Sequence, residues 1–385
     1  MAKHTFEGYR RENGAVGVRN HIAIIPVDGL SNTAAMHVAQ IIHGVEAVTH
    51  PFGEGHFGKD LELFFRTMIG VGSNPNVTAA VVIGVEPDWT DKISTAIAAT
   101  GKPIASFTIE RFGDLAVIER AARKAKEFAH YASELTKQKI DFSEITLSIK
   151  CGESDTTNGL AANPAVGQAV ERMLDWGATV LFGETSELTG AEQIIAERIQ
   201  SPAEREKFWR IYDDYVGFIA NQRADLLGSQ PTQGNIRGGL STIEEKAFGN
   251  IQKIGQAPIA GVLDPAQQPP EKGLWFMNTS STAAEALTLF AAAGSVLHLF
   301  PTGQGNIVGS PVMPVIKLSG NPLTVATMPE HIDVDVSALL TREITLKQAG
   351  DSLMDMLVRT AGGRVTSSEV LGHREFLPTK LFRSA

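Results

Sequence analysis

Short apolar runs alternate with amphipathic segments along the first third of the chain. Each run has the length of a buried strand, and each following segment repeats its apolar residues at helical spacing. Strands that alternate with helices in this way are typical of βαβ units, so we expect a parallel sheet with helices on both faces. The expected strands are 21–27, 47–52, 78–85 and 103–109, and the expected helices are 31–43, 59–69, 89–99 and 115–137.

A second alternation begins at Ile145. Its expected strands are 145–149, 178–183, 258–263, 273–278, 295–300 and 314–320, and its expected helical segments are 165–176 and 192–227. A chain of 385 residues is also too long for one compact core. We therefore predict an α/β protein with two domains, 1–140 and 141–385. Each is expected to have a parallel, Rossmann-like doubly wound sheet, with the active site at the strand carboxyl ends between the domains.

Polar loops that contain glycine follow most of the expected strands. Because the carboxyl ends of parallel strands meet at one edge of a sheet, such loops converge on one crevice. The loop that begins at Lys150 and the single cysteine, Cys151, holds the most chemistry, since Glu153 and Asp155 follow at once. The sequence therefore predicts a functional site around this loop.

Carboxylates and a thiol would come together at this edge. Asp155, Glu184 and Glu187 with Cys151 supply the mixed oxygen and sulfur ligands that suit Fe²⁺ or Mn²⁺, whereas pure oxygen ligation favours Mg²⁺ or Ca²⁺. The alternative is structural: a buried cysteine that packs as a small hydrophobe, and glutamates that complement a helix dipole. The chain has no HExxH, CxxC or Walker motif that would indicate a zinc or nucleotide site.

Other residues are candidates for proton transfer and anion binding. His50 and His56 lie at or after a strand end among glycines, whereas His298 lies within an apolar alternation and is expected in the core. The glycine-rich runs 302–309 and 234–240 could cradle a carboxylate or sulfonate with backbone N–H groups. Arg237, within the second run, would add a bidentate contact to an anion.

Composition narrows the class of protein. Hydrophobic content of 43% and charged content of 20% are those of a globular protein, and no apolar run is long enough for a membrane helix. The start has no signal-peptide pattern, and one cysteine cannot form an internal disulfide, so we expect a cytoplasmic protein. A net charge of −9 argues against nucleic acid as a partner but leaves small anionic substrates open.

Several segments together resemble the altronate and galactarate dehydratases, over nearly the whole chain. Within this family the runs KCGESDTT, GETSELTG and LGHREFLPTKLF are most similar to the large subunits of the branch that cleaves (2R)-sulfolactate. One loop departs from the family pattern, because 50–56 lacks the cysteine that the dehydratases carry there. The resembling segments are 8–20, 150–167, 183–192, 234–255, 273–278 and 300–321.

The resemblance implies a metal-dependent lyase that eliminates a leaving group from carbon 3 of a 2-hydroxy acid. The favoured reaction converts (2R)-sulfolactate to pyruvate and sulfite, and the alternative dehydrates a sugar acid to a 2-keto-3-deoxy acid. A divalent metal is implied, Fe²⁺ in preference to Mn²⁺ or Mg²⁺. Full-length sugar-acid dehydratases carry a further small N-terminal domain, so a separate small partner subunit and an oligomer are also implied. A noncatalytic acid-binding or regulatory subunit is the competing interpretation.

The resemblance also suggests roles for individual residues. Cys151, Asp155, Glu184 and Glu187 would be metal ligands or their immediate neighbours. His50 or His56 would be the base, and Lys150 would also take part in catalysis. The residues that would bind the substrate are Arg19, Asn20, Arg237, Thr302, Gly303 and Lys317.

Overall fold

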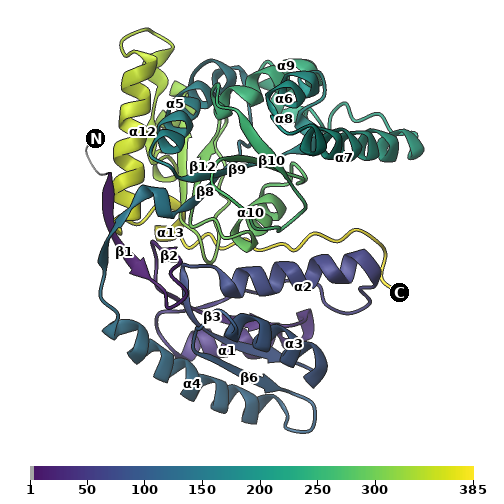
Figure 1. Cartoon of the computed structure of the whole chain (residues 1–385), viewed down its shortest axis with the longest axis vertical. Helices are drawn as coiled ribbons and strands as arrows, with labels where there is room; N and C mark the ends of the chain where they lie inside the picture. The colour runs from purple at the N-terminus through teal and green to yellow at the C-terminus, as the bar shows by residue number, and fades with distance from the viewer. Residues whose placement is uncertain (1–3) are drawn as a thin grey trace.

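A computed structural model of the chain describes residues 4–385. Figure 1 shows two α/β domains, one above the other, with the N-terminal part of the chain in the lower one. Both main sheets are parallel and carry helices on their faces, so the predicted fold class is confirmed. No helix of the described residues is both long and apolar enough to cross a membrane.

The first domain is a four-stranded sheet with the strand order β4-β3-β5-β6. Every residue of β5 is buried, as expected for a central parallel strand. Helices α1 and α4 pack together, as do α2 and α3. The strands are β3 (His21–Pro26), β4 (Val45–Ala47), β5 (Val77–Gly84) and β6 (Ile104–Thr108), and the helices are α1 (Asn32–Ile41), α2 (Gly58–Ser73), α3 (Pro87–Ala98) and α4 (Asp114–Glu134).

One expected strand of this domain is misplaced. Pairing with β3 ends at Ala47, and the segment expected at 47–52 leaves the sheet as a loop. Pro51 has no N–H to donate to a ladder, and Gly53 has a φ of 136°, which an extended strand does not allow.

The second domain has seven parallel strands in the order β10-β11-β9-β8-β12-β13-β14. From β8 the chain continues to β9 on one side, and from β12 it continues to β13 on the other. A crevice forms where connections diverge in this way, so the carboxyl ends of β8 and β12 define a binding edge. The strands are β8 (Thr146–Ile149), β9 (Thr179–Phe182), β10 (Ile259–Leu263), β11 (Leu274–Met277), β12 (Leu297–Pro301), β13 (Val315–Ser319) and β14 (Val334–Asp335).

Helices cover both faces of this second sheet. α5 packs against α12 on one face, and α10 lies on the face toward the first domain, where it contacts α2. α7 projects from the side of the domain (Figure 1). The helices are α5 (Asn163–Asp175), α6 (Glu192–Arg198), α7 (Pro202–Asn221), α8 (Gln233–Arg237), α9 (Ile243–Asn250), α10 (Ala283–Ala292), α11 (Pro322–Thr327), α12 (Leu346–Ala361) and α13 (Ser367–Val370).

A small antiparallel sheet, which the sequence pattern did not predict, joins the two domains. In it β1 (Thr5–Arg10) lies between β2 (Val16–Gly17) and β7 (Gln138–Asp141). β1 runs beside α12 (Figure 1), and Phe6 is buried in the core of the second domain. Strand β1 therefore packs on the second domain.

The interface between the domains is closely packed. A Cβ at Gly70 of α2 would lie 2.3 Å from the carbonyl oxygen of Ala292 in α10, so only glycine allows this approach. The side-chain amide of Asn74 donates hydrogen bonds to the carbonyls of Ala291 and Ser295 at 2.7 and 2.8 Å. The end of the chain returns across the first domain, where Leu381 N donates to Asp60 Oδ1 at 2.8 Å.

Candidate active site

Strand ends of the second domain place the candidate residues. Lys150 and Cys151 follow β8, and Glu184 follows β9. Glu184 has a left-handed backbone, with a φ of 72°, and its N–H donates to Thr279 Oγ1 at 2.8 Å. A left-handed conformation costs a non-glycine residue roughly 1–3 kcal/mol and is found mostly at functional sites. This backbone directs the Glu184 side chain toward Cys151.

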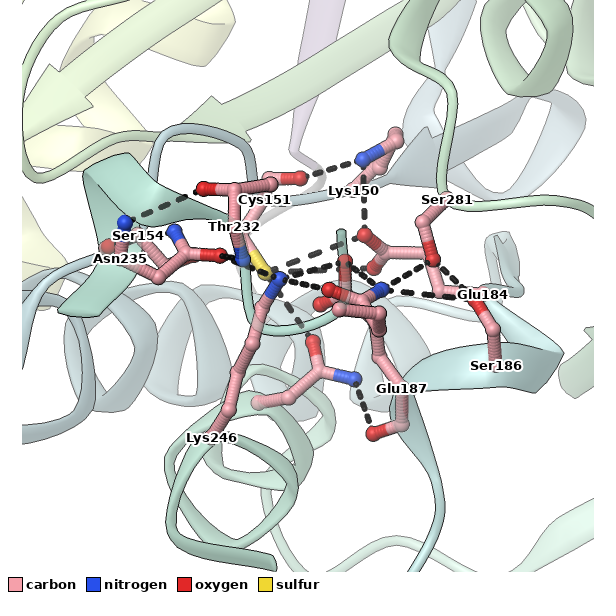
Figure 2. A network of polar contacts seen from close by, with 12 residues as sticks. Lys150, Cys151, Ser154, Glu184, Ser186, Glu187, Thr232, Asn235, Lys246 and Ser281 are labelled. Atoms are coloured by element: carbon pink, nitrogen blue, oxygen red, sulfur yellow. Dashed lines mark hydrogen bonds and ion pairs between the residues drawn. The ribbon is translucent and has the colours of Figure 1, made fainter. Parts of the chain in front are cut away.

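The thiol of Cys151 and the carboxylates of Glu184 and Glu187 form a buried cluster (Figure 2). One ligand atom from each residue lies within 4.8 Å of the others. Their exposed fractions are 2%, 0% and 3%. Buried carboxylates of this kind require compensating charge.

Three lysines provide that compensation. Lys150 Nζ lies 2.8 Å from Glu184 Oε1, and Lys246 Nζ lies 3.0 Å from Glu187 Oε1. Lys253 Nζ forms an ion pair with Glu184 Oε2 and lies 3.5 Å from Cys151 Sγ. Figure 2 shows Lys150 and Lys246 approaching the two carboxylates from different sides.

Burial and the charges of this cluster shift the pKa of Lys150, Glu187 and Cys151. Burial alone would lower the pKa of Lys150, but Glu184 and Glu187 outweigh it and raise that pKa. Burial alone would raise the pKa of Glu187, but Lys246, Lys150 and Lys253 lower it to about 2. Burial, reinforced by Glu184, raises the pKa of the Cys151 thiol. Lys150 and Glu187 are therefore charged at neutral pH.

A cavity of about 250 Å³ opens onto this cluster. Its lining includes Lys150, Glu153, Glu187 and Lys246, together with hydroxyl and amide side chains. All its lining residues come from the second domain. The active site was expected between the two domains; this cavity lies within the second domain, and apolar packing of α2 on α10 fills the interface.

The cluster has the composition of a metal site. A thiol and two carboxylates converge, and Glu187 Oε2 is buried without a hydrogen-bond partner in the described part of the chain. A buried carboxylate oxygen without a donor is costly unless a ligand satisfies it. The three residues could therefore hold a divalent metal.

Comparisons with known proteins identify the family of the chain. Residues 8–133 match the second domain of D-galactarate dehydratase/altronate hydrolase, and residues 142–384 match the C-terminal domain of D-galactarate/altronate dehydratase. The chain belongs to this dehydratase family.

Named relatives fall into two groups. The chain is 57% identical to the (2R)-sulfolactate sulfo-lyase subunit beta of Chromohalobacter salexigens, over 99% of this chain and 98% of that protein. It is 26% identical to the altronate dehydratase of Bacillus subtilis, over 99% of this chain and 78% of that enzyme. It is 28% identical to the galactarate dehydratase of Escherichia coli, over 94% of this chain and 73% of that enzyme.

Asp155, expected beside the metal, is directed elsewhere. Its Oδ1 accepts hydrogen bonds from the N–H and hydroxyl of Thr157 at 2.8 and 2.6 Å. Its Oδ2 accepts from Asn321 at 2.7 Å. The side chain therefore fixes the turn that leads into α5 and stays outside the cluster of Cys151, Glu184 and Glu187.

His50 and His56 lie in the first domain and line no part of the cavity. His50 Nε2 lies 3.0 Å from the carbonyl oxygen of Pro26, and His56 Nδ1 lies 2.9 Å from Asp60 Oδ2. Burial lowers the pKa of both histidines. The loop that carries them is held near the end of the chain by the bond between Asp60 and Leu381.

Arg19 and Asn20, expected to bind substrate, make structural contacts. Arg19 pairs with Glu369 and donates to the carbonyl of Thr360 at 2.9 Å. Asn20 accepts from Arg11 at 2.8 Å and donates to the carbonyl of Ala132 at 2.7 Å. These bonds join the N-terminal segment to its surroundings.

The other expected substrate residues are dispersed. Arg237 is exposed at the end of α8 and lies outside the cavity lining. Thr302 is buried, and a Cβ at Gly303 would lie 2.3 Å from Asp155. Lys317 of β13 is fully buried, its Nζ has no hydrogen-bond partner among the described residues, and burial lowers its pKa to about 8. His298 is buried, as expected.

Three residues that line or support the site were not singled out by the sequence analysis. Lys246, Asn250 and Lys253 lie at i, i+4 and i+7, a spacing that places them on one face of α9 and the turn after it. The signal available in the sequence was this helical face of polar residues, two of them lysines. All three side chains are buried in the structure. Gln230 supports this face, because its Oε1 accepts from Lys246 Nζ at 2.6 Å.

Proposed function

We propose that this chain is the large, metal-binding subunit of a lyase that converts (2R)-sulfolactate to pyruvate and sulfite. The main support is the 57% identity to the sulfo-lyase subunit over 99% of the chain. The buried cluster of thiol, carboxylates and ammonium groups beneath a small polar cavity supplies the chemistry that such a reaction needs.

The proposed metal ligands are Cys151, Glu184 and Glu187. Fe²⁺ suits this mixture of one sulfur and two carboxylates, with Mn²⁺ or Mg²⁺ as alternatives. A bound divalent cation supplies Lewis-acid stabilisation of the negative charge that develops on the substrate. The lysines around the cluster hold the ligands in place through Glu184 Oε1 and Glu187 Oε1.

Lys150 and Lys246 provide fixed positive charge at the cavity. Both line it, and the neighbouring carboxylates keep the pKa of Lys150 above its ordinary value. A protonated lysine cannot serve as the base, but it stabilises a carboxylate and an enolate next to it. These two ammonium groups therefore bind the carboxylate end of the substrate.

We assign the base to Glu153, in place of the histidines of the first domain. Its carboxylate is exposed at the cavity and makes no hydrogen bond or ion pair within the described residues. Its φ of 49° places the side chain in a strained loop. Glu153 takes the proton from carbon 2, and the electrons of that bond form the double bond between carbons 2 and 3.

Elimination then completes the reaction. The bond between carbon 3 and sulfur breaks, and sulfite leaves with the electron pair. The product is the enol of pyruvate, which tautomerises to pyruvate. A charged sulfite is a stable leaving group, so no general acid is required at carbon 3.

A small partner subunit and assembly into an oligomer in the cytoplasm complete the proposal. The relative from Chromohalobacter salexigens is named a subunit beta, and the dehydratases are longer than the segment matched here. A partner that covers the cavity would exclude water and strengthen the electrostatic contacts inside it.

A sugar-acid dehydratase is the second candidate. The cavity lining includes the hydroxyls of Ser281 and Thr282 and the amides of Gln230 and Asn235, which suit a polyhydroxylated acid. The test offers (2R)-sulfolactate, altronate and galactarate to the chain with Fe²⁺ and a candidate small subunit. Release of sulfite with pyruvate supports the proposal, and formation of a keto-deoxy acid without sulfite contradicts it.

A further inference from the structure

The cavity has a second wall that the mechanism above does not use. Ser281, Thr282 and Ala283 line it, and they form the start of helix α10. The lining also includes Lys150, Lys246 and Glu187. A ligand in the cavity would therefore touch the charged cluster and the first turn of α10 together.

The first turn of α10 offers free hydrogen-bond donors. Thr282 is the N-cap residue, but its side chain makes no capping hydrogen bond. The backbone N–H groups of Ala283 and Ala284 donate to no acceptor in the part of the chain that the structure describes. Unpaired N–H groups and the positive end of the helix dipole together favour an anion.

An acidic side chain in this turn, Glu285, is hydrogen-bonded to hydroxyl groups. The carboxylate of Glu285 accepts hydrogen bonds from the hydroxyls of Ser280 and Thr379, at 2.6 and 3.5 Å. The Glu285 carboxylate thus has hydrogen-bond partners of its own. The N–H groups of Ala283 and Ala284 keep their free positions.

A second unsatisfied polar group lines the same cavity. Glu187 lines the cavity with an exposed fraction of only 3%, and its Oε2 has no hydrogen-bond partner among the described residues. Such an oxygen requires a hydroxyl donor or a cation. The lining of the cavity thus combines an unsatisfied acceptor with the unsatisfied donors of α10.

We propose that the first turn of α10 binds the sulfonate of the substrate, the group that leaves as sulfite. This inference rests on the proposed function and adds the position of the leaving group. A sulfonate has three acceptor oxygens for the N–H groups, and its charge increases as the carbon–sulfur bond breaks. Fixed donors that meet increasing charge stabilise the transition state more than the ground state.

The same feature would select against sugar acids. A hydroxyl leaving group is neutral and needs a proton from a general acid. The residues at the start of α10 that line the cavity carry no titratable side chain. The turn therefore favours elimination of an anion over elimination of water.

The test replaces one donor and keeps the helix. Ala283 is the first helical residue, where proline is favoured, and the preceding Thr282 has φ −65° and ψ 118°, which proline tolerates in its neighbour. Ala283→Pro therefore removes one N–H with little effect on folding. The matched control is Leu346→Pro, the same change at the first residue of α12, where Thr345 has φ −85° and ψ 160°.

Two probes distinguish binding of the sulfonate end of the substrate from binding of its hydroxy-acid end. 3-Sulfopropanoate carries the sulfonate without the hydroxyl, and lactate carries the hydroxyl without the sulfonate. Calorimetry on the full chain should show about tenfold weaker binding of 3-sulfopropanoate in Ala283→Pro, with lactate binding unchanged. Leu346→Pro should bind both probes like the wild type. No binding of 3-sulfopropanoate by the wild type, or an equal effect on both probes, overturns the inference.

A sulfite-release assay distinguishes the inference from the proposed function. If the wild type binds 3-sulfopropanoate through α10 but releases no sulfite from (2R)-sulfolactate, the anion site stands and the proposed reaction fails. If sulfite is released while Ala283→Pro binds both probes normally, the reaction stands and the sulfonate lies elsewhere.

Discussion

Arg19 and Glu369, which are 350 positions apart in the chain, form a bidentate ion pair. Arg19 Nε lies 2.6 Å from Glu369 Oε1, and Arg19 Nη2 lies 2.9 Å from Oε2. The side chains are largely buried, with exposed fractions of 10% and 18%. The pair fastens the segment after β2 to α13, so the two ends of the chain stabilise each other.

Loss of this pair should weaken the fold in a pH-dependent way. Burial alone would raise the pKa of Glu369, but its bonds to Arg19 and Thr366 lower it below 4.5. The ionised carboxylate therefore contributes stability above about pH 4.5, and this contribution is lost as the pH falls through the lower folded pKa. Glu369→Gln should reduce the free energy of unfolding by about 2 kcal/mol at about pH 7. Urea unfolding at about pH 7 and about pH 3 measures the difference, which should shrink in acid; an equal difference at both values would contradict the assignment.

Glu184→Gln should remove bound metal and activity together. Elemental analysis of the purified variant, after loading with Fe²⁺ and desalting, measures the metal directly. Cys151→Ser is a second variant that removes one ligand with little change of size. Full metal content in both variants would exclude these residues as ligands. Glu285→Gln, outside the cluster, is the matched control and should retain metal.

Glu153→Gln should separate metal binding from catalysis. The residue lines the cavity but lies outside the metal-ligand group, so metal content should equal that of the wild type. Loss of a general base should lower kcat by about 100-fold or more. Sulfite release under saturating substrate gives kcat, and a wild-type rate would assign the base elsewhere.

Lys317→Met should stabilise the chain at neutral pH. Burial lowers the pKa of Lys317 from 10.5 to about 8, so the charged form is disfavoured in the folded state. The free-energy cost of keeping the charged lysine buried is complete below the folded pKa. It decreases between the folded and unfolded pKa values and is absent above the unfolded value. It corresponds to about 3 kcal/mol.

Thermal unfolding tests this prediction. The Tm of Lys317→Met should exceed that of the wild type at about pH 7, and the two should converge as the pH approaches 10.5. A lower Tm for the variant at about pH 7 would show that Lys317 has a stabilising partner under those conditions. Lys272→Met, which removes an exposed lysine, is the control and should change little.

The sequence predicts those parts of the fold that depend on local patterns. The alternation of apolar runs located most strands of both parallel sheets, but it misplaced β4 and missed β14. The loops after β8 and β9 were recognised from their residues. The sheet of β1, β2 and β7 was missed, because Thr5 pairs with Asp141 across more than a hundred positions and neither strand has a strong apolar pattern.

The site shows a similar division. Cys151, Glu184 and Glu187 were brought together by the rule that parallel strand ends converge, and the structure places them in one cluster. Asp155 lies in the same loop, but its direction depends on Thr157 and Asn321, which no strand rule could supply. Lys246 of α9 and Lys253 of the turn after it were missed, because charged residues at helical spacing are ordinarily found on a solvated surface.

The contact between Gly70 and Ala292 gives the first domain a mechanical role. α10 begins at the cavity wall and ends against α2, so the first domain supports the far end of the helix whose near end faces the substrate. A side chain at position 70 would push α10 away from α2 and so displace the first turn of α10. The first domain contributes no residue to the cavity, yet its contact with α10 determines the position of the cavity wall that α10 forms.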